Sequence, residues 1–491
     1  MSLQELLHSR QSFAVQPAPG SGASVAVAAN VLDIAGRLDG ELGAGCERVA
    51  LLLPQGRTQA VTLLAAMTRG AAVPINPRLT SEEIAFALRD TAADALVVSG
   101  SDPVSGAAAL VANELGMRVL DADVAEQWNQ LPTSAARQRP DRELDEIAVL
   151  LHTSGTTAQP KLVPLTGANL LSSASAVAMS LKLESTDVGI AMMPLFHIHG
   201  IVGVLLASLV ADASVVVVPF DAFSIHRIVE QSAATWISAV PTMYSLMLQR
   251  RASAPMESLR LLRSSSAALA PTVWAALEDR YGCPVVNSYG MTEAAHQMTA
   301  TDVRFGSAEV GLVGRSAGTE IAVLVDGVPV ACGVGEVVIC GPGVMHAYLA
   351  SADSDRAHLD PDAFVDRWFR TGDIGEIDRA GRLRLHGRSK EIINVGGEKV
   401  SPFEVEEVLL AHGRVREAVA YAMLSGRLGE EVHAAVVISG ETDERALRSY
   451  ARERLAKFKT PTRIHIVTEI PKGPTGKVQR RLLADAFAAT S

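Results

Sequence analysis

Short apolar segments alternate with amphipathic segments between residues 48 and 290. The segment "RVALLLP" (48–54) is typical of a buried strand, "TQAVTLLAAMTRG" (58–70) of a helix, and "AAVPINP" (71–77) of a second strand. The same alternation recurs over residues 144–220 and 234–290. This pattern predicts an α/β protein whose large N-terminal part has mostly parallel sheets covered by helices.

The pattern changes after residue 306. The segments "EIAVLV", "GEVVIC" and "GRLRLHG" predict short strands joined by Gly and Asp turns, and hence a small β-rich portion. From residue 400 onward, a helix, two strands, a helix and a strand predict a compact α+β domain. Because 491 residues exceed what one core usually holds, we expect at least two domains.

Charge and hydropathy exclude two classes of protein. A net charge of −10 argues against a nucleic-acid binder, which needs a basic face. The most apolar stretch, 200–220, is interrupted by Asp212, so we expect no membrane-spanning helix. Neither an N-terminal signal peptide nor a C-terminal peroxisomal address is evident. The cysteines lack metal-ligand spacing, which favours reduced thiols. We therefore expect a cytoplasmic location. These cysteines are Cys46, Cys283, Cys332 and Cys340.

The stretch "LHTSGTTAQPKLVPLT" (151–166) gathers hydroxyls, a glycine and a lysine. It is not a Walker P-loop, which needs two glycines and a Lys-Ser or Lys-Thr pair that opens a helix. Hydroxyl donors, close backbone approach and one charge nevertheless suit a polyphosphate. Phosphate binding and an ordinary polar loop both remain open for this stretch. The residues concerned are Thr153, Ser154, Gly155, Thr156, Thr157 and Lys161.

The stretch "NSYGMTEAAHQM" (287–298) combines an aromatic ring, a hydroxyl and a carboxylate. Tyr289 can stack on a base, Thr292 can bond a phosphate, and Glu293 is a hard oxygen ligand that suits magnesium. The alternative is a helix N-terminus capped by Thr292.

Two further stretches each carry one charged candidate. In "FRTGDIGEID" (369–378), Asp373 suits the two hydroxyls of a ribose, although such a segment is more often a surface turn. In "PKGPTGKVQRR" (471–481), Lys477 lies in a glycine-flanked loop that suits delivery of a cation to a reacting phosphate. A solvated basic tail is the alternative there.

In this order and spacing, the four stretches resemble the adenylate-forming superfamily of acyl-CoA synthetases, luciferases and peptide-synthetase adenylation domains. The resemblance covers nearly the whole chain and also includes "GRSKEIINVGGEKVSPFEVE". Within the superfamily, the chain resembles the oxalate–CoA ligases. The segments that carry this narrower resemblance are "PKLVPLT", "MPLFHIHG", "SSSAALAP", "YGMTEAAHQM" and "GGEKVSPFEVEEVLL".

The resemblance implies a domain division and a two-step reaction. Residues 1–387 would form the adenylation domain, 388–391 a hinge, and 392–491 a mobile C-terminal domain. ATP, with Mg²⁺, and a carboxylate would give an acyl-adenylate and pyrophosphate, and the thiol of coenzyme A would then displace AMP. We expect a monomer or homodimer that binds these small molecules, without nucleic-acid partners or membrane insertion.

The resemblance also implies nucleotide-binding roles. Thr292 would touch the α-phosphate, Glu293 would hold magnesium, and Lys477 would bridge the carboxylate and the α-phosphate. Asp373 and Arg388 would bind the ribose hydroxyls. The β- and γ-phosphates would lie at Thr153, Ser154, Gly155, Thr156, Thr157 and Lys161, and the adenine at Ala267, Ala268, Asn287, Ser288, Tyr289 and Gly290.

A second set of implied roles concerns thioester formation. Lys390 matches the hinge about which the C-terminal domain rotates and withdraws Lys477. Gly396 and Gly397 would then border the pantetheine tunnel, where side chains would block the thiol. His197 matches a gating aromatic position near that tunnel.

The expected acid pocket is polar. Hydrogen-bonding groups at the pocket suit the second carboxylate of a very small acid, and we expect oxalate. Lone histidines and serines are also common as structural residues. The polar positions expected at the pocket are His199 after "LFHI", Arg263 to Ser266 in "RSSSA", and His296 after "TEAA". The acid-binding candidates among them are His199, Ser264, Ser266 and His296.

Three other functions remain open. The first is a malonyl-CoA or other short-chain acyl-CoA synthetase. The second is a free-standing adenylation domain that loads a carrier protein. The third is a nucleotide-binding regulator without catalysis, against which the presence of Glu293, Asp373, Arg388 and Lys477 argues.

Overall fold

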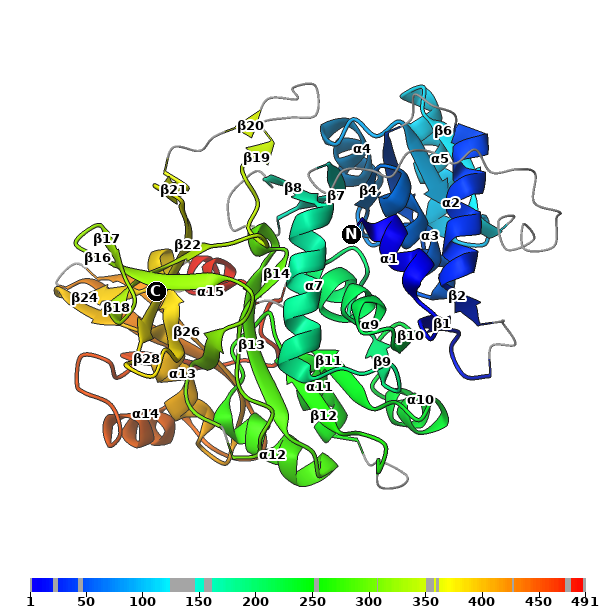
Figure 1. Ribbon diagram of the computed structural model, residues 1–491. Coiled ribbons are helices and arrows are strands. Elements are labelled where there is room, and N and C mark those ends of the chain that lie inside the picture. The colour runs from blue at the N-terminus through cyan, green and yellow to red at the C-terminus, as the bar shows by residue number, and fades with distance from the viewer. Residues whose placement is uncertain are drawn as a thin grey trace.

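A computed structural model shows a large α/β body with a smaller sheet domain at its C-terminal end (Figure 1). It describes residues 2–20, 25–42, 47–123, 146–153, 161–250, 256–306, 308–349, 357–358, 362–425, 428–472 and 478–488.

The largest sheet has a parallel half and an antiparallel half. The strands β1, β10, β9, β11, β12 and β13 pair in parallel, and pairing becomes antiparallel from β13 onward. The spatial order is β17 (Val328–Val330), β16 (Glu320–Val325), β18 (Gly333–Cys340), β22 (Trp368–Ile377), β23 (Leu383–Arg388), β15 (Leu312–Ser316), β14 (His296–Ala300), β13 (Val285–Met291), β12 (Leu261–Ser264), β11 (Trp236–Ala239), β9 (Val188–Ala191), β10 (Ser214–Val217), β1 (Ala14–Gln16) and β2 (Ala26–Val27), with β21 (Phe364–Val365) beside β22.

The second sheet forms most of the N-terminal part, drawn in blue in Figure 1. Its central strands pair in parallel, and β7 and β8 form an antiparallel hairpin. The order is β20 (Ala357–His358), β19 (Tyr348–Leu349), β8 (Leu162–Thr166), β7 (Ile147–His152), β4 (Ala71–Pro74), β3 (Arg48–Leu52), β5 (Ala95–Val98) and β6 (Arg118–Asp121).

Two helices lie between these sheets. α3 (Arg57–Arg69) contacts β3, β4 and β7 of the second sheet and β1 and β10 of the first, so it is buried along most of its length. α7 (Gly167–Leu181) contacts β8 on one side and β14 on the other. A capping box between Thr166 and Asn169 fixes the start of α7 directly after β8. One aliphatic core therefore joins both sheets.

The remaining helices lie on the sheets or, like α8 (Ile198–Gly200) and the π-helix η2 (Ile201–Leu206), are buried within the large body. The others are α1 (Leu3–Ser9), α2 (Ala28–Leu42), α4 (Ser81–Asp90), α5 (Pro103–Glu114), α9 (Ala207–Val210), α10 (Ile225–Gln231), α11 (Pro241–Leu248), α12 (Pro271–Tyr281), α13 (Pro402–Leu410), α14 (Glu444–Arg452) and α15 (Arg480–Ala488), with the 3₁₀ turns η3 (Thr292–Ala294) and η4 (Ser389–Glu391). Within the described ranges, no helix is long and apolar enough to cross a membrane.

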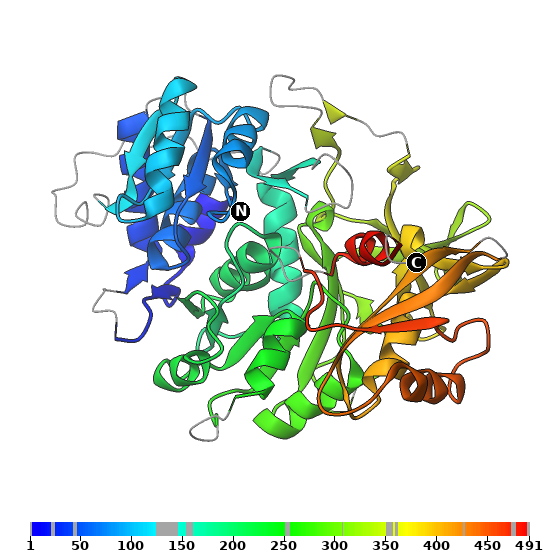
Figure 2. The ribbon, with the colours of Figure 1, turned by 180° about the vertical axis from the view of Figure 1, so that it is seen from behind.

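The C-terminal sheet is separate from the other two. Its order is β25 (Glu398–Val400), β24 (Ile393–Val395), β27 (Gly429–Ile438) and β26 (Val415–Ser425), with β28 (Arg463–Ile466) parallel to β27. Helix α13 packs between β26 and β23 of the large sheet, and α15 lies against β26, as the view from behind shows (Figure 2). Because β24, the first strand of this sheet along the chain, follows β23, the C-terminal sheet begins after β23.

The predicted α/β class is confirmed, and the strands and helices fall where the sequence pattern placed them. The predicted β-rich portion after residue 306 is present, and β14 and β15 join its strands to the parallel half of the large sheet. One alternative considered for the sequence is wrong. Thr292 does not cap an α-helix, because η3 is a single 3₁₀ turn and Met291 occupies its N-cap position.

Candidate active site

The carboxyl ends of three parallel strands meet at the centre of the large sheet. Register places Ser238 of β11 beside Arg263 of β12, and Ser264 of β12 beside Asn287 of β13. Ligands in α/β sheets bind outside the carboxyl ends of the strands. The antiparallel return of β14 then brings its first residue, His296, to the same edge.

Arg263 lies at the centre of this edge and is fully buried. Its Nη1 donates to Ser238 Oγ at 3.0 Å, and its Nη2 donates to Gln297 Oε1 at 2.9 Å and to His296 Nε2 at 3.0 Å. None of the described carboxylates pairs with it, and its Nε has no hydrogen-bond partner. Burial lowers the pKa of the guanidinium to about 9. The site therefore holds a desolvated cation without a counter-charge.

Two histidine rings stack beside the guanidinium. The rings of His199 and His296 lie 4.8 Å apart at 22°. Since Arg263 can only donate, Nε2 of His296 must be an unprotonated acceptor. Burial, followed by the charge of Arg263, holds the pKa of both imidazoles well below the ordinary value. Both histidines are therefore neutral at pH 7.

Hydroxyl groups complete this cluster. His199 Nε2 lies 2.7 Å from Ser238 Oγ, and its Nδ1 lies 3.0 Å from Ser266 Oγ. Ser264 is buried, and its Oγ has no hydrogen-bond partner. One guanidinium nitrogen and one hydroxyl therefore retain unused hydrogen-bonding capacity, which suits a small anion.

The structure brings His199, Ser266 and His296 together, whereas Ser264, at the end of β12, does not hydrogen-bond to them through its Oγ. Two residues of this cluster, Ser238 and Gln297, were not among the expected acid-pocket positions, whereas Arg263 was expected there as the first residue of "RSSSA". The signal that was available for Ser238 is its place at the end of the apolar strand "WISA", beside the strand that carries Arg263.

A second cluster surrounds Glu293. One carboxylate oxygen accepts a hydrogen bond of 2.9 Å from the Tyr348 hydroxyl. The ammonium of Lys161 lies 4.4 Å from the centre of the same tyrosine ring. Lys161 and Thr153 are joined by two hydrogen bonds, Thr153 N to Lys161 O at 2.8 Å and Lys161 N to Thr153 Oγ1 at 3.2 Å. These bonds hold Thr153 and Lys161 together. Strand β8, which directly follows Lys161, lies against η3, the turn that carries Glu293.

A third cluster joins β13 to β22 and β23. The hydroxyl of Tyr289 donates to Asp373 Oδ2, and Arg388 Nε pairs with Asp373 Oδ1 at 2.7 Å. Burial and the charge of Asp373 hold the pKa of Tyr289 well above its ordinary value. Asp373 is opposite Arg388 in register, so the two predicted ribose-binding side chains are neighbours.

The other predicted adenine-binding residues lie at the ends of β12 and β13. Ala267 and Ala268 are exposed in the loop after β12, whereas Asn287 and Ser288 are buried in β13. Gly290 follows a register shift in the pairing of β13 with β14. His197 precedes α8, and its ring lies 4.6 Å from that of Phe196.

The predicted hinge and tunnel residues lie near the junction with the C-terminal sheet. Lys390 is exposed in η4, and the following residue, Glu391, pairs with Arg480 of α15 at 3.0 Å. Gly396 and Gly397 form the turn between β24 and β25 with φ angles of +61° and +96°. A two-residue hairpin turn with two positive φ angles favours glycine, so the turn itself accounts for this pair.

Five predicted residues lie outside the described residues: Ser154, Gly155, Thr156, Thr157 and Lys477. The ends of the segment that contains Lys477 are held together, because Lys472 bridges to Val478 and Gln479 N donates to Pro471 O at 3.1 Å.

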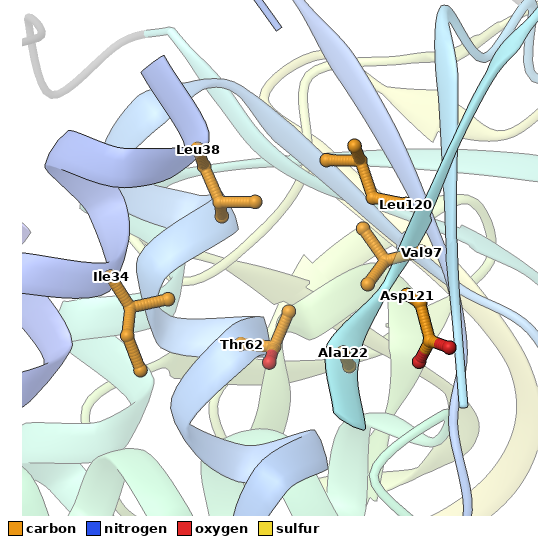
Figure 3. A pocket seen from close by; sticks show the side chains of 7 residues that line it. All are labelled: Ile34, Leu38, Thr62, Val97, Leu120, Asp121 and Ala122. Atoms are coloured by element: carbon orange, nitrogen blue, oxygen red, sulfur yellow. The ribbon is translucent and has the colours of Figure 1, made fainter. Parts of the chain in front are cut away.

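A small pocket in the N-terminal part contains none of the predicted site residues (Figure 3). Its one carboxylate, Asp121, already accepts hydrogen bonds from the backbone of Gly100 and Asp123. The other side chains that line it are apolar or a threonine, so the pocket offers no catalytic chemistry. The lining residues are Ile34, Leu38, Thr62, Val97, Leu120, Asp121 and Ala122.

Comparison with known proteins gives consistent matches over most of the chain. Residues 26–349 match the model of the AMP-binding enzyme family, and residues 404–477 match that of the AMP-binding enzyme C-terminal domain. The chain is 37% identical to the oxalate–CoA ligase of Arabidopsis thaliana over 460 residues, which covers 89% of this chain and 88% of the relative. It is 40% identical to the oxalate–CoA ligase of Saccharomyces cerevisiae over 353 residues, 70% of this chain and 64% of the relative.

Ligases for other acids match as well, among them the sulfoacetate–CoA ligase of Cupriavidus necator, at 36% identity over 89% of this chain and 87% of the relative. Among solved structures, the O-succinylbenzoate coenzyme A synthetase of Bacillus subtilis in complex with ATP and a magnesium ion matches with a TM-score of 0.83 at 26% identity. That match covers 98% of both chains.

Proposed function

The chain belongs to the AMP-binding enzyme family, and from this premise we propose that it activates oxalate with ATP and transfers the oxalyl group to coenzyme A. The family match and the relatives support the broader activity, an AMP-forming and ATP-dependent acid–CoA ligase. The narrower proposal, oxalate as the acid, depends on the cluster around Arg263.

The observation that carries the proposal is the buried cation without a counter-charge. Arg263 has four neutral side chains around it and no described carboxylate partner. Burying the distal carboxylate of oxalate without a partner would cost several kcal/mol, and a guanidinium removes that cost. The neutral rings of His199 and His296, stacked beside the guanidinium, do not repel an anion. A fatty-acid enzyme would need apolar walls at this place.

The nucleotide is proposed to lie between the other two clusters. Asp373 and Arg388 would bind the ribose, Thr292 the α-phosphate, and Lys161 with the segment after Thr153 the β- and γ-phosphates. The adenine would lie against Tyr289. Tyr348 holds one carboxylate oxygen of Glu293, and the other is a hard oxygen ligand that fits a magnesium ion. Bound magnesium would neutralise charge on the phosphates.

The two half-reactions are proposed to use two positions of the C-terminal domain. Lys477 would stabilise the negative charge that builds up as the carboxylate attacks the α-phosphate. Rotation about residues 388–391, with Lys390 at the hinge, would then remove Lys477 and bring the Gly396–Gly397 turn toward the thiol path. His197 would lie beside that path as a gate.

Replacement of Arg263 tests the acid proposal. Loss of one partner of a buried charged hydrogen bond costs on the order of 2–5 kcal/mol, which is about 30- to several-thousand-fold. Arg263→Gln should lower kcat/KM for oxalate by a factor in that range, leave the KM for ATP unchanged, and affect acetate far less. Arg315→Gln, at an exposed arginine, is the matched control and should change neither. Oxalate kinetics at the wild-type level in Arg263→Gln would contradict the proposal.

A further inference from the structure

We propose that Tyr348 is a positioning residue that connects the phosphate-binding lysine, Lys161, to the magnesium-binding carboxylate, Glu293. The proposal rests on the nucleotide roles proposed above for those two residues. Tyr348 itself is not part of any motif singled out in the sequence. It is 7% exposed and stands between the two charged groups.

The hydroxyl of Tyr348 fixes the direction of the carboxylate. It donates to Glu293 Oε1 at 2.9 Å, and the backbone of Glu293 is fixed as well, since Met345 N donates to its carbonyl at 2.8 Å. Glu293 is 9% exposed, so its carboxylate is largely shielded from water. With one oxygen held by the phenol, the second oxygen points in a defined direction. Hydrogen bonds to metal-binding carboxylates typically contribute about 10- to 100-fold to metal affinity or activity.

The ring of Tyr348 fixes the lysine. The ammonium of Lys161 lies over the ring, 4.4 Å from its centre, within the range of a cation–π interaction. The ring is itself held edge-on by Phe369, with ring centres 6.5 Å apart. Phe369 belongs to β22, the strand that carries Asp373. One tyrosine therefore contacts groups assigned to the phosphates and the metal, and packs on the strand assigned to the ribose.

Strand register explains why these residues meet. β19 pairs with β8 at Leu349 and Leu162, and each of these is the immediate neighbour of Tyr348 or Lys161. Tyr348 is the first residue of β19 and Met345 precedes that strand, and both hydrogen-bond to Glu293 of η3. The short strand β19 therefore joins the start of β8, next to Lys161, to the η3 turn that carries Glu293. The lysine and the carboxylate thus keep a defined separation before ATP binds.

The hydroxyl and the ring can be tested separately. Tyr348→Phe keeps the ring and its contacts with Lys161 and Phe369 but loses the bond to Glu293. Tyr348→Leu loses both. The probe is Mn²⁺, whose binding to the enzyme with a non-hydrolysable ATP analogue is followed by electron paramagnetic resonance. Affinity for the analogue is measured again without metal, in EDTA. Tyr450→Phe, at a tyrosine of α14 in the C-terminal domain, is the matched control.

We expect Tyr348→Phe to weaken Mn²⁺ binding by about 10- to 100-fold and to keep its analogue affinity in EDTA. Raised Mg²⁺ should restore its rate of pyrophosphate release, which a general packing defect would not allow. Tyr348→Leu should also lose analogue affinity in EDTA, and Tyr450→Phe should match wild type. Wild-type Mn²⁺ affinity in Tyr348→Phe would overturn the inference. Absence of Mn²⁺ binding in the wild-type complex would instead overturn the proposed metal site itself.

Discussion

Nη2 of Arg263 lies 3.0 Å from Nε2 of His296, so a buried guanidinium donates to a neutral imidazole. Buried arginines usually pair with carboxylates, because an unpaired buried charge is costly. Here the protein bears that cost without a substrate, and an incoming anion would relieve it. The pair therefore gives the acid pocket an unused positive charge.

Replacement of His296 should affect dicarboxylates selectively. His296→Ala removes an acceptor of Arg263 and the ring stacked on His199. We expect kcat/KM for oxalate to fall by tens- to thousands-fold, about 2–5 kcal/mol, and KM for ATP to stay unchanged. Acetate, which lacks the second carboxylate, should lose far less. Equal losses for oxalate and acetate in steady-state assays would argue against a distal-carboxylate role.

The pKa of Arg263 predicts a pH limit for oxalate binding. Burial lowers this pKa to about 9, so the guanidinium is charged below pH 9 and loses its proton above it in the free enzyme. We expect kcat/KM for oxalate to fall by about tenfold per pH unit above 9. In the unfolded chain the arginine keeps its proton to higher pH, so this group makes folding more favourable, not less, as pH rises above 9.

Because deprotonation of Arg263 makes folding more favourable, it is not expected to cause a loss of activity above pH 9 through unfolding. The control is Arg263→Gln, whose residual kcat/KM for oxalate should show no break near pH 9. A break that persists in this variant would assign the titration to another group.

Gly203 of the π-helix η2 is expected to be required for the histidine pair. A Cβ at this position would lie 2.7 Å from His296 Nε2 and 2.9 Å from His199 Cδ2, so both rings would have to move. Gly203→Ala should raise the KM for oxalate and leave the KM for ATP unchanged. Gly106→Ala is the matched control, because a Cβ there meets no atom within 4 Å. An unchanged KM for oxalate in Gly203→Ala would show that the rings tolerate the shift.

Lys477 is expected to serve adenylation and not thioester formation. Lys477→Ala should lose most acid-dependent pyrophosphate release, by about a hundred- to thousand-fold. It should still convert supplied oxalyl-adenylate to oxalyl-CoA. Lys472→Ala is the control, since Lys472 pairs with Glu417 at 2.5 Å and should matter little to either step. Equal loss in both half-reactions would contradict the two-position account.

Restriction of the hinge should affect the second half-reaction. Lys390→Pro fixes φ near −65° in η4, whereas Lys390→Ala keeps backbone freedom. We expect the proline variant to slow thioester formation more than adenylation and the alanine variant to slow neither. Measurement of both half-reactions separately decides this, and wild-type rates in the proline variant would place the hinge elsewhere.

Sequence patterns predicted the parts of this protein that depend on local signals. Apolar segments marked β3 and β4, and "PFEVEEVLLAH" marked α13. The segments of His199 and His296 were correctly expected to converge, because each either follows an apolar strand or begins a strand that runs back along one. Tyr348 could not be found in this way. Its contacts with Lys161 and Glu293 depend on the pairing of β19 with β8, which no local pattern in "HAYLA" reveals.

The burial of Arg263 was also beyond local prediction. Its segment is polar, and a polar segment after a strand usually faces solvent. Burial follows only once β11 and β13 flank β12 and the side chains of Ser238, His296 and Gln297 close around the guanidinium. The available clue was positional, since Ser238 and Arg263 end neighbouring strands.

The most direct test of the account is the acid preference of the wild-type enzyme. Pyrophosphate release should be measured with ATP, Mg²⁺ and coenzyme A for oxalate, malonate, sulfoacetate, acetate and medium-chain acids at a series of concentrations. The account predicts the highest kcat/KM for oxalate, with AMP and oxalyl-CoA formed in equal amounts. A higher kcat/KM for malonate, sulfoacetate or acetate would contradict the proposed substrate, and release that does not depend on any acid would contradict the ligase activity itself.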